Sequence, residues 1–201
     1  MDTNIWSAII SAASGLTGAV IGGWATLKAT KASNAHQLKL QQQEQKQRID
    51  GVLRAIHCEL EVLMKFYASE AGKVLDSLKS GNPYTAYFVL TEKYFIVYPT
   101  NTALVAQIDD PDLSRSIIVT YNKANFLIEM FRINNRYIEW RNECIKLSRD
   151  GTESKYIVMG NEILGLQVAH AASLKKADAD LKSTTEELLA KISAYLARKN
   201  K

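Results

Sequence analysis

One stretch near the start of the chain constrains the fold more than any other: Ile5 to Leu27 is 23 residues long and contains no charged side chain. A helix of this length would span about 34 Å, enough to cross the hydrocarbon core of a bilayer. Trp6 and Trp24 lie near its two ends, where indole rings favour the membrane–water boundary. The stretch predicts a transmembrane helix. A buried N-terminal helix of a soluble protein is the alternative, because Ala and Ser keep its hydropathy modest.

Charge on the two sides of this stretch sets the expected orientation. The residues before it, MDTN, include one acid and no base, whereas residues 28–48 carry five basic residues and the single acid Glu44. Basic residues stay on the cytoplasmic side of a membrane. The pattern predicts a single-pass protein of the bacterial inner membrane, with the N-terminus outside and the C-terminal part in the cytoplasm. The residues expected at the membrane interface are Trp6, Trp24, Lys28 and Lys31.

Small residues recur at steps of three and four along the same stretch. They are Ala8, Ser11, Gly15, Gly18, Gly22, Ala25 and Ala29, with Ala32 beyond them. No hydrophobic force draws helices together in lipid, so association depends on close van der Waals contact, which small residues permit. Gly18 and Gly22 form a GxxxG pair within the series. The stripe predicts a homo-oligomer that assembles through the membrane helix.

The rest of the chain predicts helices throughout. Residues 28–48 contain no Gly or Pro and almost no apolar periodicity, which indicates a polar, basic juxtamembrane helix. Apolar residues at helical spacing then continue to the C-terminus. The expected fold is all-α: residues 1–27 form a short outer tip and the transmembrane helix, which continues through 28–48, and residues 49–201 form a cytoplasmic helical bundle with a long antiparallel hairpin.

Within residues 49–201, turn and cap signals give approximate helix bounds. The first helix runs from Ile49 through Val74 towards Leu78, and the "SGNP" sequence at 80–83 ends it. The aromatic sequence that follows fits short strands or a helix, and we favour a helix from Tyr84 to Lys93. Six aromatic residues there are expected to supply much of the core. They are Tyr84, Tyr87, Phe88, Tyr94, Phe95 and Tyr98.

The hairpin has clearer signals. In "DDPDLS", Asp110 can cap a helix and Pro111 suits its first position. This helix is expected to run through apolar residues such as Ile117, Tyr121, Phe126 and Phe131 towards Leu147, and Gly151 ends it. A second long helix then runs to about Arg198. The short "RDGT" connection predicts that the two helices are antiparallel.

Motifs of known enzyme chemistry are missing from the sequence: it has no phosphate-binding loop, no GxGxxG, no GxSxG, no HExxH and no CxxC. His57 and Glu61, one turn apart beside Cys58, are too few ligands for zinc. His170 lies on the apolar side of its helix, where it fits a core histidine with its hydrogen bonds made rather than a catalytic one. We therefore expect no catalytic residue, no metal and no cofactor. A net charge of +4 is too mild to indicate nucleic acid as a partner.

Two segments carry a resemblance to a known group. The layout, with "VYPTNTALVAQIDDPDLSRSIIVTYNKANFLIE" at 97–129, resembles bacterial single-pass proteins with a small helical cytoplasmic domain. Among these, it is similar to the HEPN-like membrane accessory protein of RNA-targeting CRISPR systems, which forms a membrane pore. In "RNECIK", Arg141 and Asn142 match the HEPN ribonuclease motif, but Lys146 stands where that motif has histidine. The departure puts ribonuclease activity in doubt.

These patterns lead to three functional hypotheses. The first is a non-enzymatic, oligomeric inner-membrane protein that perturbs the bilayer or forms a pore, such as an effector of antiphage defence. The second is a membrane-tethered scaffold or sensor that binds a protein partner. The third is a ribonuclease with a degenerate HEPN site. The expected partners are the lipid bilayer, further copies of the chain and a protein.

Overall fold

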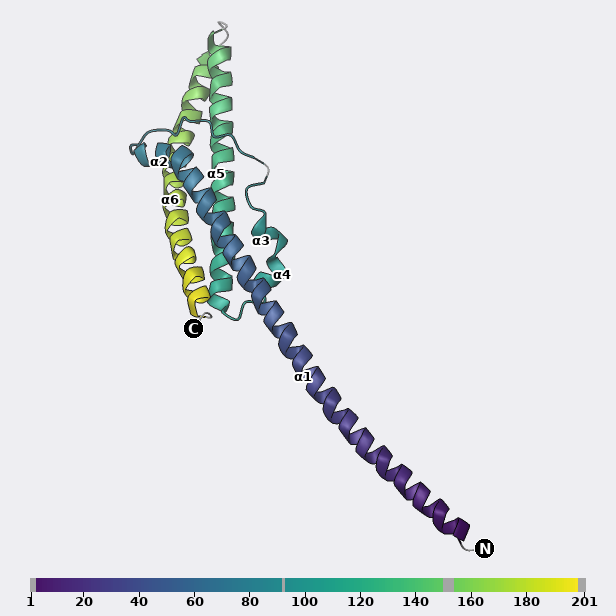
Figure 1. Ribbon diagram of the computed structural model, residues 1–201. Helices are drawn as coiled ribbons and strands as arrows, with labels where there is room; N and C mark the ends of the chain where they lie inside the picture. The colour runs from purple at the N-terminus through teal and green to yellow at the C-terminus, as the bar shows by residue number, and fades with distance from the viewer. Residues whose placement is uncertain (1–2, 92, 150–153, 199–201) are drawn as a thin grey trace. The chain divides into compact units, whose positions relative to one another are not determined.

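The computed structural model describes residues 3–91, 93–149 and 154–198 (Figure 1). Side chains are described from residue 24 onward, apart from those of residues 25, 27, 29 and 32. The described chain is all-helical, as expected, and contains no strand. It divides into two compact units, Met1–Arg48 and Ile49–Lys201. No helix among the described residues has a stretch long and apolar enough to cross a membrane.

Helix α1 (Thr3–Tyr67) supplies the described part of the first unit and the first helix of the second. It passes into a π-helical turn, η1 (Ala68–Gly72), and a short helix, α2 (Lys73–Ser77). Two further short helices follow, α3 (Val97–Thr100) and α4 (Thr102–Val105). The chain then forms two long helices, α5 (Pro111–Arg149) and α6 (Ser154–Arg198).

The predicted hairpin is confirmed, because α5 and α6 lie side by side and run in opposite directions (Figure 1). Lys123 of α5 binds Asp180 of α6 at 2.8 Å, and the Met130 carbonyl lies 2.8 Å from His170 Nε2. The predicted cap is also present: Asp110 Oδ1 accepts hydrogen bonds from the amides of Asp112 and Leu113 at 3.1 and 3.0 Å. Residues 150–153, which include the predicted end at Gly151, lie outside the described part.

The C-terminal part of α1, from Ile49 onward, packs on this hairpin as a third helix. Its buried positions fall at steps of three and four and face buried residues of both long helices. The cluster contains Ile49, Leu53, Ile56 and Leu60 of α1, Ile117 and Tyr121 of α5, and Leu188 and Ile192 of α6. The apolar periodicity from residue 49 therefore identified the core-facing side of α1 correctly.

The expected helix from Tyr84 to Lys93 is wrong. Residues 78–96, called the strap below, are neither helix nor strand in their described part, which excludes residue 92. Side chains alternate along the strap: Tyr84, Ala86, Phe88 and Leu90 face inward, and the residues between them are exposed. A period of two fits extended backbone rather than a helix.

Side chains of α5 and α6 explain how the strap stays extended without a neighbouring strand. The Asn135 amide donates to the Phe88 carbonyl at 2.7 Å and accepts from the Phe88 amide at 3.2 Å. Gln167 Nε2 donates to the Tyr84 carbonyl at 2.7 Å. Backbone polar groups lose stability when they are buried without partners, and these two amides supply the partners.

The first helical segment ends at Ser77, one residue before Leu78 and just before the "SGNP" sequence, where Gly81 takes a left-handed turn conformation (φ 81°). Tyr87, which was expected in the core, is exposed, and Val74 and Phe126 of the apolar helix patterns are exposed too. Tyr87 alternates outward on the strap, where its hydroxyl donates to Glu139 at 2.9 Å. The sequence pattern had counted each of these as apolar without fixing which side of its segment faces the hairpin.

Candidate binding pocket

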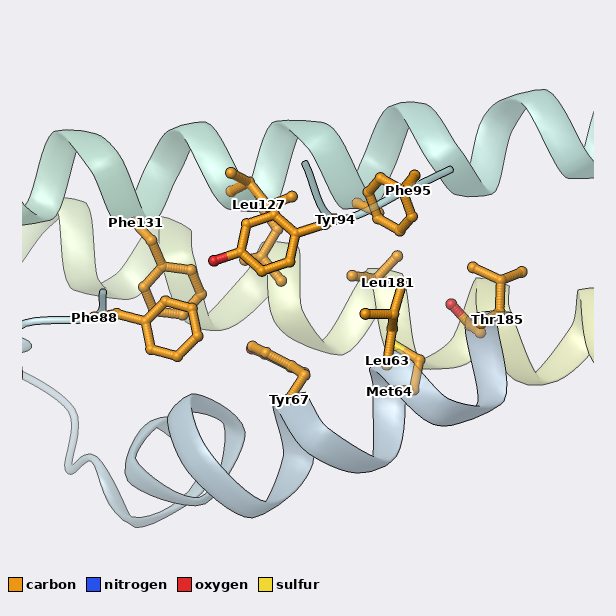
Figure 2. A pocket seen from close by; sticks show the side chains of 13 residues that line it. Leu63, Met64, Tyr67, Phe88, Tyr94, Phe95, Leu127, Phe131, Leu181 and Thr185 are labelled. Atoms are coloured by element: carbon orange, nitrogen blue, oxygen red, sulfur yellow. The ribbon is translucent and has the colours of Figure 1, made fainter. Parts of the chain in front are cut away.

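A small cavity of about 70 Å³ lies inside the second unit, between α1, the strap and the α5–α6 hairpin (Figure 2). Its buried wall consists of Leu60, Ala124, Leu127, Phe131, Leu181 and Thr185. Half-buried side chains complete it on the α1 and strap side: Leu63, Met64, Tyr67, Phe88, Tyr94, Phe95 and Ile128. None of these residues carries a charge.

Helix spacing and side-chain size together create this cavity. Ala124 and Phe131 lie seven residues apart on the inner side of α5, and Leu181 and Thr185 lie one turn apart on α6. The short side chain of Ala124 leaves space that a larger residue would fill. Phe131 packs against the strap residue Phe88, with ring centroids 5.0 Å apart. The walls are therefore aromatic and aliphatic, as in most small-molecule sites.

Thr185 is the one polar residue in the buried wall. It is 2% exposed, and its hydroxyl has no hydrogen-bond partner. Figure 2 shows this hydroxyl directed into the cavity. Other helical threonines bond to the carbonyl four residues earlier, as Thr120 does at 2.8 Å and Thr184 at 2.7 Å. A buried unpartnered hydroxyl costs about 1–3 kcal/mol, so its presence in the wall calls for an explanation.

The other two hydroxyl groups in the wall already have partners. Tyr94 Oη accepts from the Thr91 amide at 2.9 Å and donates to the Val89 carbonyl at 3.4 Å. Tyr67 Oη donates to Asp178 Oδ1 at 2.7 Å. Thr185 is therefore the group in the cavity wall that is left to bind a polar atom of a guest molecule.

A polar network extends from Tyr67, one of the residues that line the cavity. Asp178, which is 3% exposed, accepts from Tyr67 and pairs with Lys182 at 3.0 Å. Lys182 also binds Asp76 at 2.9 Å. Burial and the bond to Asp178 raise the pKa of Tyr67 far above its ordinary value. Burial lowers the pKa of Lys182, but its two carboxylate partners outweigh that effect and the net shift is upward. The network therefore places a neutral tyrosine beside two ion pairs.

Glu59 of α1 fixes the other end of the strap. Its Oε1 accepts from the amides of Ile96 and Val97 at 2.7 and 2.8 Å, and its Oε2 accepts from the Tyr121 hydroxyl at 2.6 Å. Burial and this bond raise the pKa of Tyr121 far above its ordinary value. Glu59 thereby satisfies the first amides of α3, which have no partner within that helix.

A second feature lies on the outer side of α5. Large apolar residues recur there every seven positions and are 39–60% exposed. They are Val119, Phe126, Ile133 and Trp140. Seven residues make almost two helical turns, so the four side chains follow one face of the helix. We call this set the α5 seam. Exposed apolar residues that occur singly need no explanation, whereas an aligned series is a candidate interaction surface.

None of the predicted site residues with described side chains lines the cavity or belongs to the α5 seam. The small-residue stripe from Ala8 to Ala29, with Trp6, lies outside the described side chains. Trp24 and Lys28 are exposed, and the Lys28 ammonium lies 5.3 Å from the Trp24 ring centroid. Lys31 is also exposed.

The HEPN-like motif lies near the end of α5. Arg141 is half-buried, and Asn142 and Lys146 are exposed. The two histidines of the second unit have other partners: His57 contacts Ser193 and Glu61, and His170 donates to the Met130 carbonyl. In the described part of the chain, no three His, Cys, Asp or Glu side chains are grouped so that they could hold a metal ion.

Sequence reasoning missed Thr185 and the residues that hold the strap. A signal for Thr185 exists, because buried positions of α6 alternate at steps of three and four and some of them are polar. The series is Ile163, Gln167, Ala171, Leu174, Asp178, Leu181, Thr185, Leu188 and Ile192. The polar interruptions of this pattern mark the layers where α6 meets the strap, Tyr67 and the cavity.

Comparisons of the chain with protein-family models, with curated proteins and with solved structures gave no match.

Proposed function

We propose that this protein is a self-associating, membrane-anchored effector without enzymatic activity, and that its helical domain contributes to assembly. The α5 seam is the observation that supports this proposal. Exposing four large apolar side chains to water is unfavourable in free energy, and burying them against a partner is favourable. Anchoring rests on the uncharged stretch Ile5–Leu27 and on the basic residues after it. Inner-membrane insertion with a cytoplasmic helical domain belongs to the same proposal.

The seam is complementary to itself in an antiparallel arrangement. If a two-fold axis passes Ile133, Phe126 of each copy faces Trp140 of the other, since each lies seven residues from the axis. Glu129 of one copy then lies beside Arg136 of the other, so opposite charges meet at the edge of the seam. A second copy of the chain is therefore the occupant that we propose for this face.

Double substitution of the seam tests the assembly. Phe126→Glu/Trp140→Glu adds two carboxylates to each copy where the copies should touch, and we expect the purified chain in detergent to fall to half its mass or less by light scattering. The matched control is Asn125→Glu/Asn142→Glu, which adds the same charge to α5 at exposed positions outside the seam. An unchanged mass in the seam variant would contradict the proposal.

Membrane perturbation is a separate part of the proposal, and it rests on the small-residue stripe. Gly18→Leu/Gly22→Leu places bulky side chains where membrane helices should approach closely, without weakening helix formation or insertion. We expect dye leakage on expression to disappear in this variant and to persist in Ile9→Leu/Ile10→Leu. Equal leakage from both variants would contradict a pore built by the stripe.

A membrane-tethered scaffold or sensor is the second candidate. The start of α6 favours it, because Ile157, Val158 and Met159 are consecutive and exposed, and such a surface suits a different protein. A chain that stays monomeric in detergent, causes no leakage and co-purifies with one protein would support this candidate. The degenerate HEPN ribonuclease would require RNA decay that Arg141→Ala abolishes.

A further inference from the structure

We propose that the cavity beside Thr185 binds a small, neutral, mostly hydrocarbon molecule that carries a single hydroxyl or carbonyl oxygen. Phenols and small alcohols are members of this class. The proposal does not depend on membrane anchoring or on self-association, because it rests on the wall of the cavity alone.

The chemistry of the wall excludes charged guests. None of the thirteen lining residues is ionised at neutral pH, and the tyrosine hydroxyls of Tyr67 and Tyr94 already have partners. A charged molecule would lose its hydration without gaining a counter-charge, which is strongly unfavourable. The guest must therefore be neutral.

The same wall is a poor site for water alone. Buried water usually makes about three hydrogen bonds to protein groups. Here a water could bond to the Thr185 hydroxyl, but the neighbouring surfaces are the apolar side chains of Leu181, Leu127 and Phe131. A guest with one oxygen and a hydrocarbon body satisfies the hydroxyl and fills the apolar space at the same time.

Wall shape favours a guest with a ring. The cavity of about 70 Å³ is smaller than the engineered cavity of about 150 Å³ that holds benzene, so a ring guest enters only if neighbouring half-buried side chains move outward. Phe88 and Phe131 form an aromatic corner, and aromatic groups pack well against such a corner in tilted or edge-on geometry. The half-buried side chains of Leu63, Met64 and Tyr94 lie on the side towards α1 and the strap, where a guest can enter once they move.

Phenol and toluene make a matched pair of probes, because they differ by a hydroxyl in place of a methyl group. We expect both to bind the full-length chain by isothermal titration calorimetry. In Thr185→Val, which keeps the shape and removes the hydroxyl, we expect the Kd of phenol to rise about tenfold. The Kd of toluene should stay the same or fall. Thr184→Val is the control, since Thr184 bonds to Lys123 and to the Asp180 carbonyl.

A second variant tests the location of the site. Ala124→Leu adds a branched side chain to the cavity, and we expect it to abolish binding of both probes while the circular dichroism of the helices is unchanged. If this variant fails to fold, nuclear Overhauser contacts between phenol and the Leu181 methyl groups in the wild-type chain decide the location. The proposal is overturned if the wild-type chain binds neither probe, if binding persists in Ala124→Leu, or if Thr185→Val affects both probes equally.

Discussion

The two parts of helix α1 differ sharply although they belong to one helix. From Ser33 to Arg48 every described side chain is exposed, and the sequence is polar on all sides. From Ile49 onward the same helix has buried positions at Ile49, Leu53, Ile56 and Leu60. Helix propensity is high in both parts, so propensity does not separate them. The comparison shows that burial against the hairpin, and not helix propensity, distinguishes the part of α1 from Ile49 onward.

The largest expected difference between the two parts comes from truncating a leucine in each. Leu53 is fully buried, whereas Leu40 is 45% exposed. Leu53→Ala should lower the free energy of unfolding by about 2–5 kcal/mol, through lost burial and a new cavity. Leu40→Ala should change it by less than about 0.5 kcal/mol. Thermal unfolding of the full chain, followed by near-UV circular dichroism, measures both. Equal losses of unfolding free energy in the two variants would contradict the claim that only the part of α1 from Ile49 onward is stabilised by packing.

Glutamates give a second matched pair. Glu59 accepts three hydrogen bonds from Ile96, Val97 and Tyr121, whereas Glu44 is an exposed residue of the polar part. Glu59→Ala leaves two amides and a hydroxyl without their partner and should cost about 2 kcal/mol or more. Glu44→Ala should be neutral. Faster proteolysis within the strap of the Glu59 variant would confirm that the Glu59 carboxylate holds the strap in place. An unchanged cleavage rate would contradict this role.

Alkaline pH should destabilise the packed part through its buried tyrosines. Burial raises the pKa of Tyr84 to about 12, and burial with a carboxylate partner raises the pKa values of Tyr67 and Tyr121 further. The unfolded chain loses these protons near pH 10, so the stability they contribute is complete below pH 10 and falls as the pH rises towards 12 and beyond. Tyrosinate absorbance and near-UV circular dichroism should change together in one transition. Ionisation of these tyrosines at pH 10 with the fold intact would contradict this.

The smallest expected effect is a gain in the free energy of unfolding from a substitution near the boundary of the two parts of α1. Gly51 lies within α1, is exposed, and has nothing within 4 Å of the place where a Cβ atom would be. Gly51→Ala should raise the free energy of unfolding by about 0.5–1 kcal/mol, because alanine loses less backbone freedom in a helix. Gly72→Ala is the contrasting variant: its Cβ would lie 3.2 Å from the Tyr67 carbonyl oxygen. A gain from Gly72→Ala as large as that from Gly51→Ala would remove the contrast.

Local signals were sufficient to predict the hairpin and the core-facing side of α1. Asp110 and Pro111 mark the start of α5 within a few residues of sequence, and the apolar positions of α1 repeat at helical spacing. The strap was predicted incorrectly because its conformation depends on distant partners. Asn135 lies 47 positions from Phe88 and Gln167 lies 83 positions from Tyr84, and no local pattern connects them.

The candidate binding pocket could not be predicted from the sequence, for a related reason. Thr185 is one of several polar residues on α6, and only the packing of three helices and the strap leaves its hydroxyl without a partner. The α5 seam could have been found, since a spacing of seven is visible in the sequence. Apolar periodicity alone, however, does not separate a face that packs in the core from one that stays exposed, as Phe126 illustrates.

The way in which the strap is held also sets how the molecule fluctuates. The Phe88 amide proton is bonded to the Asn135 side chain, whereas amide protons within α5 are bonded along the helix backbone. Lifting the strap therefore exposes the Phe88 proton to solvent without melting a helix. Under native conditions this proton should exchange through a local opening that has a lower free energy than global unfolding. Amide protons at the centre of α5 should exchange only when the whole domain unfolds.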